Sequence, residues 1–146
     1  MFYFRSCYRL QNYKMSGWSA YIDTLTNSSE GIKRAAIIGA SDASVWARTE
    51  EKNEFRATEA ELKKLVSLFG DLSAVPTVGV DLEGVHYIVP RTEENLIFGK
   101  KDKTGFFAAK TKSAILIALF EGEGAAGSEA RVAVEKLAAY LADTGY

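Results

Sequence analysis

Residues 96–120 read LIFGKKDKTGFFAAKTKSAILIALF, and this stretch decides the fold of the chain. Three apolar runs, at 96–98, 105–109 and 114–120, are separated by the polar segments Lys-Lys-Asp-Lys-Thr and Lys-Thr-Lys. Connections this short leave no room for a crossover helix, so neighbouring strands have to pair antiparallel. The stretch therefore predicts consecutive strands of an antiparallel meander.

More strands are predicted upstream of this stretch. The turn segment Asp-Leu-Glu-Gly separates two further runs, at 78–80 and 85–89. These runs extend the meander towards the N-terminus. Shorter runs at 35–39 and 45–48 are separated by Ala-Ser-Asp-Ala-Ser, which is typical turn chemistry between strands. These two runs predict a separate hairpin that carries Trp46.

Amphipathic segments predict helices before, between and after the strands. The clearest is 58–69, which begins with a capping-box pattern formed by Thr58 and Glu61. Ser16 is the expected N-cap of a short first helix, and the last helix is expected over 128–143. The apolar stripe of the first helix consists of Trp18, Tyr21, Ile22 and Leu25. Helices segregated from a run of strands are typical of an α+β fold in which helices cover an antiparallel sheet.

The composition restricts the class of protein. With 146 residues, 47% of them hydrophobic and 25% charged, the chain has the length and balance of one globular domain. Its formal net charge of -1 supplies no overall field that would attract nucleic acid. Cys7 is the single cysteine, which excludes an intramolecular disulfide and fits a reducing compartment. We therefore expect a cytoplasmic protein without nucleic-acid partners.

The first residues of the chain differ from the rest. Residues 1–14 are rich in aromatic and basic side chains and contain no acidic one. They lack the continuous apolar core of a secretory signal. We interpret 1–14 as an N-terminal extension, either disordered or produced by a misassigned start codon, and 15–146 as a single domain.

No set of residues in the sequence meets the requirements of a catalytic or metal site. His86 is the only histidine and lies in a predicted strand, where a histidine with a satisfied ring nitrogen is the more common case. The segment 99–105 contains glycines and lysines but lacks the Gly-Lys-Ser/Thr order of a phosphate loop. Asp81 and Glu83 have no third acid at calcium-loop spacing. We therefore expect no enzyme activity, no cofactor and no metal.

A set of aromatic residues lies towards the two chain ends and on the first hairpin: Trp18, Tyr21, Trp46, Tyr140 and Tyr146. One interpretation is core filling, because tryptophan is highly buried on average. The alternative is that aliphatic residues already anchor the terminal helices, which leaves these rings to face outward. Outward rings with polar tips suit a groove for a polyproline II ligand, whose carbonyls accept from indole N–H and tyrosine O–H groups.

A basic cluster lies on the meander and consists of Lys100, Lys101, Lys103, Lys110 and Lys112. Lysines at hairpin tips and sheet edges often serve only to solvate the protein or to prevent edge pairing. The same charges also fit an acidic partner surface or an anionic lipid headgroup. The sequence leaves these alternatives open.

Several short strings, taken together and in order, resemble the profilin family. They are Trp18-Ser-Ala-Tyr-Ile-Asp, Ala36-Ile-Ile-Gly, Ser44-Val-Trp-Ala, Gly84-Val-His-Tyr, Phe98-Gly-Lys-Lys, Lys110-Thr-Lys-Ser-Ala-Ile-Leu and Val134-Glu-Lys-Leu-Ala-Ala-Tyr-Leu. The resemblance covers residues 15–146. It implies a central antiparallel sheet with the N- and C-terminal helices side by side on one face and a further helix on the other.

The resemblance also implies partners and site residues. Profilins bind monomeric actin and proline-rich proteins such as formins, and they occur in the cytoplasm and the cytoskeleton. By position, the polyproline residues would be Trp18, Tyr21, Trp46, Tyr140 and Tyr146. The actin-facing residues would be Phe69, Arg91, Lys100, Lys101, Lys110, Arg131 and Glu135. Phosphoinositide lipids would compete for the basic surface at Lys100, Lys101 and Lys103.

Other functions remain open beside an actin regulator. A small-ligand sensor domain has a similar α+β architecture, but it requires an enclosed cavity between sheet and helix. A peripheral phosphoinositide-binding protein would depend on the lysines alone, and its binding would be lost at high ionic strength.

Overall fold

The computed structural model describes residues 18, 20–27, 31–49, 55–93, 95–122 and 126–145. These residues form a seven-stranded antiparallel sheet with the strand order β2-β1-β7-β6-β5-β4-β3. The strands are β1 (Ile32–Gly39), β2 (Val45–Arg48), β3 (Val80–Leu82), β4 (Val85–Glu93), β5 (Leu96–Lys101), β6 (Thr104–Lys110) and β7 (Ala114–Glu121). The predicted N-terminal extension 1–14 and the N-cap Ser16 lie outside the described residues.

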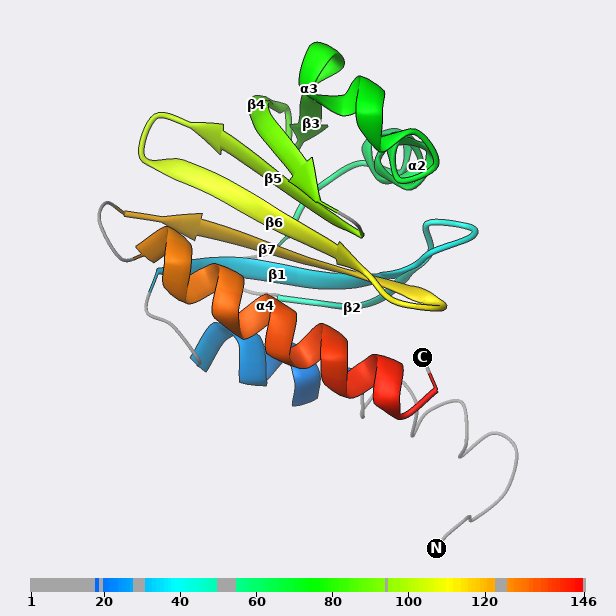
Figure 1. Ribbon diagram of the computed structural model, residues 1–146. Coiled ribbons are helices and arrows are strands. Elements are labelled where there is room, and N and C mark those ends of the chain that lie inside the picture. Colours follow the sequence, from blue (N-terminus) through cyan, green and yellow to red (C-terminus); the bar gives the residue numbers. More distant parts are fainter. Residues whose placement is uncertain are drawn as a thin grey trace, which may run out of the picture.

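Helices cover both faces of the sheet. Residues 18 and 20–27 are helical and form the N-terminal helix. This helix and α4 (Ala126–Asp143) lie side by side on one face, whereas the green helices of Figure 1 lie at the other. The green helices are α2 (Glu59–Leu68), the 3₁₀ turn η2 (Leu72–Ala74) and α3 (Val75–Val78). The predicted α+β architecture is confirmed.

The sheet joins two units that the sequence predicted separately. Strands β3 to β7 follow one another in chain order and form the predicted meander, and β1 and β2 form the predicted hairpin. The two units join because β1 also pairs with β7, in a register that runs from Ile32 opposite Phe120 to Gly39 opposite Ala114. This places β1 inside the sheet, where Ile37 and Ile38 are both fully buried although they face opposite sides.

Each face of the sheet has its own hydrophobic core. The side under the terminal helices includes Leu25, Ile37, Leu116, Val134 and Leu141, all of them fully buried. The side under α2 is a separate cluster, formed by Ile38, Leu65, Phe106, Ile115 and Ile117 among others. A sheet filled on both faces forms a rigid platform between the two helical layers.

Two predicted boundaries in the middle of the chain are wrong. The segment 78–80 was expected to be a strand, but Val78 ends α3 because Pro76 starts a short helical turn there. The strand starts at Val80, after Gly79 has turned the chain at a φ of 72°. The strand expected over 85–89 continues to Glu93, because a register shift between Ile88 and Arg91 accommodates Pro90.

The helix α2 begins as its capping box predicts. Glu61 of this capping box also binds the turn between β3 and β4. Thr58 Oγ1 accepts from Glu61 N at 3.1 Å, and Glu61 Oε1 accepts from Thr58 N at 2.8 Å. The Glu61 carboxylate also accepts the backbone N–H groups of Glu83 and Gly84, each at 2.9 Å. One side chain therefore fixes both the start of α2 and the turn between β3 and β4.

Replacing Glu61 by alanine should lower the free energy of unfolding by about 1–2 kcal/mol, because three backbone N–H groups lose a charged acceptor. The matched control is Glu59→Ala in the same helical turn, where the carboxylate pairs with Lys63 at 2.8 Å on the exposed surface. Urea unfolding of both variants measures the difference. Equal effects of the two substitutions would contradict this account of Glu61.

Candidate functional site

Four of the five predicted aromatic residues form one continuous row, which we call the aromatic row. It runs from Trp46 on β2 through Trp18 and Tyr21 on the N-terminal helix to Tyr140 on α4. The ring centroids are 4.9 Å apart for Trp46 and Trp18, 5.3 Å for Trp18 and Tyr21, and 5.9 Å for Tyr21 and Tyr140. Tyr146 lies outside the described residues.

The members of the aromatic row differ in exposure. Tyr140 is 52% exposed, Tyr21 and Trp46 are half-buried, and Trp18 is only 3% exposed. The expectation that all these rings face outward is therefore wrong for Trp18. Its indole belongs to the core under the terminal helices and contacts the rings of Tyr21 and Trp46. Trp18 forms the floor of the row, and the other three rings supply its accessible surface.

A short chain of hydrogen bonds orients the indole of Trp46. Its Nε1–H donates to Ser44 Oγ at 3.2 Å, and that hydroxyl donates to Asp42 Oδ1 at 2.9 Å. Asp42 also accepts the backbone N–H of Ser44, and these two bonds, the backbone one first, lower the pKa of the Asp42 carboxyl. Gly39 leaves the space for this turn, because a Cβ there would lie 2.5 Å from Asp42 Oδ1. The turn of the first hairpin thus fixes one end of the aromatic row.

The predicted basic cluster is divided in two by the length of β6. Lys100 and Lys101 end β5 and Lys103 lies in the following turn, so these three lie at one end of the β5–β6 hairpin. Lys110 ends β6, where its backbone N–H donates to Asn95 O at 2.8 Å. Seven residues of strand separate the ends of β6 by about 20 Å. The expected single cluster is therefore a basic end at Lys100, Lys101 and Lys103 and a separate pair at Lys110 and Lys112, at the other end of β6.

A cavity lies beside the basic end. Its volume is about 390 Å³, and it is lined by residues from the β5–β6 hairpin, the end of β7 and the first turn of α4. Phe98 and Phe120 stack with centroids 6.4 Å apart and form its apolar wall, while Lys100 and Lys103 contribute positive charge and Asp102 a negative one. A cavity with an apolar wall and a basic rim has the chemistry to hold an anionic headgroup.

The other residues predicted for the actin-facing surface lie on three elements. Phe69 is the C-cap of α2, is 8% exposed and belongs to the core under α2. Arg131 on α4 lies 2.7 Å from Glu93 on β4 and 2.9 Å from Glu135 one helical turn away. This pairing connects α4 to the far strand of the meander. Arg91 lies on β4, and its side chain is outside what the structure describes.

His86 lies opposite Asp81 in the β3–β4 pair. His86 Nδ1 lies 2.6 Å from Asp81 Oδ1 on the exposed side of paired strands, which confirms the interpretation of a satisfied surface histidine. In the described ranges, no three histidine, cysteine or acidic side chains gather as metal ligands would. Nor does any helix in those ranges have the length and apolar character needed to span a bilayer.

The fold and the aromatic row define a binding protein in which two terminal helices and a hairpin present rings from one face of a sheet. Residues 16–146 match the family model described as Profilin. The chain is 61% identical to Profilin-1 of Caenorhabditis elegans over 132 residues, which cover 90% of this chain and all of the relative. It is 35% identical to Profilin-1A of Acanthamoeba castellanii, over 88% of this chain and 98% of the relative.

A solved structure agrees with these sequence matches. The crystal structure of profilin from Schizosaccharomyces pombe superposes with a TM-score of 0.79 at 34% identity and covers 88% of this chain and 99% of that one. This chain belongs to the profilin family. The family consists of actin-binding, polyproline-binding proteins of the cytoskeleton.

Sequence reasoning missed two groups that shape these surfaces. Ser44 and Asp42 orient Trp46, yet in the sequence they look like ordinary turn residues. The pair formed by Arg131 and Glu93 joins residues 38 positions apart, and no local pattern indicates such a contact. A polar residue two positions before an aromatic ring in a turn is the one local signal that could have indicated the first group.

Proposed function

We propose that this protein binds actin monomers and proline-rich segments through separate surfaces and so regulates actin polymerisation by binding rather than by catalysis. The aromatic row is the observation that carries the proline-rich part of the proposal. Membership of the profilin family supports the actin part. A protein with these partners acts in the cytoplasm, on the actin cytoskeleton.

The aromatic row fits a polyproline II helix. Such a helix rises about 3.1 Å per residue with three residues per turn, so its proline rings recur on one side at roughly 9 Å. The neighbouring ring centroids, 4.9 to 5.9 Å apart, form a continuous run of rings on which such prolines can stack. Prolines would stack on the exposed faces of Tyr21, Trp46 and Tyr140, and Trp18 would hold those rings in place. Tyr146 belongs to the proposed site by its position in the family pattern.

Replacing Tyr140 by alanine should weaken binding of a decaproline peptide roughly 5- to 30-fold, because one accessible ring is lost. The matched control is Val132→Ala, since Val132 is on the same helix and is also 52% exposed. Tryptophan fluorescence during the titration measures the affinity of both variants. Decaproline affinities that fall equally in both variants would argue against a role for Tyr140.

The actin-facing surface is proposed to combine the basic end with the elements around it. Lys100 and Lys101 would make the charged contacts, because both are exposed at the end of β5. Arg131 and Glu135 would extend the surface onto α4, with Phe69 as buried support. Arg91 and Lys110 would complete it at the far end of the meander.

Phosphoinositide binding is proposed at the basic end, where Lys100 and Lys103 line the cavity of about 390 Å³ and Lys101 is the next residue of β5. Binding of vesicles that contain a phosphoinositide should therefore fall steeply as the salt concentration rises, because exposed charges are screened. Decaproline binding should persist under the same conditions, since it depends on ring stacking. Co-sedimentation with vesicles at several salt concentrations tests this. Salt-independent lipid binding would overturn the electrostatic mechanism.

The alternative of a small-ligand sensor finds no support in the space between the sheet and α4. That space is filled by side chains such as Leu116, Val134 and Leu141, all of which are fully buried.

A further inference from the structure

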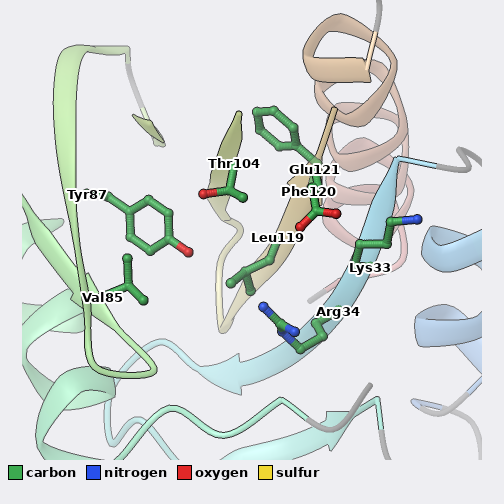
Figure 2. A pocket seen from close by; sticks show the side chains of 8 residues that line it. All are labelled: Lys33, Arg34, Val85, Tyr87, Thr104, Leu119, Phe120 and Glu121. Carbon is green, nitrogen blue, oxygen red and sulfur yellow. The ribbon is translucent and has the colours of Figure 1, made fainter. Parts of the chain in front are cut away.

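A second cavity lies on the opposite face of the sheet from the aromatic row. It has a volume of about 270 Å³ and is formed by the start of β1, the end of β7, the start of β6 and the strand β4 (Figure 2). Val85 and Leu119 contribute apolar walls. The size is close to the lower limit of small-molecule sites, which suits a ligand of amino-acid dimensions.

Arg34 enters this cavity with its guanidinium already oriented. Its Nε atom is buried and lies 2.9 Å from Glu83 Oε1, an ion pair that lacks good hydrogen-bond geometry. The Glu83 side chain is only 12% exposed, and its other oxygen accepts the backbone N–H of Arg56 at 2.7 Å. In Figure 2 the end of the guanidinium points into the hollow. Its terminal N–H groups can therefore meet a carboxylate in the bidentate manner.

Tyr87 and Thr104 add polar atoms to the same hollow. Tyr87 is 3% exposed, and burial, followed by the charge of Glu83, raises the pKa of its phenol, which stays neutral and able to donate. Thr104 Oγ1 donates to Lys101 O at 2.8 Å, and the same hydroxyl hydrogen-bonds with the Tyr87 phenol. Both oxygens point towards the centre of the cavity in Figure 2.

Two further charged residues line the cavity, Lys33 and Glu121, and they carry opposite charges. Glu121 lies on the same face of β7 as Leu119, the residue opposite Arg34, and lines the same cavity. Neither Glu121 nor Lys33 forms an ion pair through its side chain with any residue that the structure describes. A polyphosphate would be repelled by Glu121, whereas a ligand that carries both charges would satisfy both sides.

We propose that this cavity binds a small zwitterion of the α-amino-acid class. The ligand carboxylate meets Arg34, its ammonium group meets Glu121, and a short apolar side chain packs against Val85 and Leu119. The site shares no residue with the aromatic row, and Thr104 connects it to the basic end.

Titration of the full chain with leucine, followed by amide chemical shifts, tests the proposal. Leucine should bind saturably in the millimolar range and shift resonances around the cavity. 4-Methylpentanoate, which lacks the ammonium group, and 3-methylbutylamine, which lacks the carboxylate, should each bind about tenfold more weakly. Shifts that never saturate would overturn the proposal. Inorganic phosphate that binds as well as leucine would also overturn it, because the site would then be a general anion site.

Variants can distinguish ligand binding by Arg34 from a purely structural role of its ion pair with Glu83. Arg34→Gln should abolish leucine binding, but it also leaves Glu83 unpaired and can disturb the fold. Glu121→Gln is the safer variant, because Glu121 is exposed, and it should remove the preference for leucine over 4-methylpentanoate. Lys112→Gln removes an exposed charge from the turn between β6 and β7, at the other end of β7, and should change nothing. An unchanged preference in Glu121→Gln would contradict the proposed orientation.

Discussion

Replacement of Trp18 by alanine is expected to lower the free energy of unfolding by about 3–5 kcal/mol and to abolish measurable decaproline binding. The stability loss follows because the indole is 3% exposed and lies in the core under the terminal helices. Binding is lost because Tyr21 and Trp46 both rest on this ring. Urea unfolding and a decaproline titration followed by the fluorescence of Trp46 measure the two effects.

Trp18→Phe is the companion variant. It tests whether Trp18 supports the accessible rings or contacts the decaproline peptide directly. It keeps an apolar ring in the core, so the loss of stability should be roughly 1–2 kcal/mol and the protein should remain folded. Decaproline binding should then be reduced but detectable, because the accessible rings keep most of their support. A Trp18→Ala protein that is fully folded and binds decaproline like the unaltered chain would refute the role of Trp18 as the floor of the row.

The double substitution Lys100→Glu, Lys101→Glu is expected to weaken binding of monomeric actin by about 100-fold, because two attractive charges become repulsive. Both side chains are exposed at the end of β5, so the fold should not change. Decaproline affinity should stay the same, since the aromatic row lies on other elements. Sedimentation or fluorescence assays with labelled actin monomers measure the change.

The control for this prediction is Lys63→Glu, Lys64→Glu on α2, which reverses the same number of exposed charges elsewhere. Actin affinity should be nearly unaffected by it. If both double variants weaken actin binding equally, the effect comes from net charge and the assignment of Lys100 and Lys101 fails. If actin and decaproline binding are lost together, the variant is misfolded.

Local signals predicted most of the fold. The capping box at Thr58 located the start of α2, and the short polar connections after 98 and 109 determined the meander. The pairing of β1 with β7 was not predicted, because it joins residues about eighty positions apart and depends on both strands being apolar on both faces. The continuation of β4 past Pro90 was missed because a register shift leaves no trace in the sequence pattern.

The candidate site was predicted less completely than the fold. The aromatic residues predicted near the two chain ends do meet, since the rings of Tyr21 and Tyr140 are in contact. The burial of Trp18 was not predicted, since a stripe with helical spacing identifies the face of a helix but not how deeply each member is covered. The lysines are divided between the two ends of β6 because this strand is seven residues long. The strand before it was predicted to end at residue 98, but β5 continues to Lys101 and includes Lys100 and Lys101.

The central claim is that the aromatic row receives a proline-rich ligand, and the indole N–H resonances of Trp18 and Trp46 test it most directly. During a decaproline titration of the full chain, both indole signals and the backbone amide of Tyr140 are expected to shift with one common dissociation constant. Saturable binding that leaves both indole signals unmoved, with shifts confined to the face that carries α2, would contradict the claim.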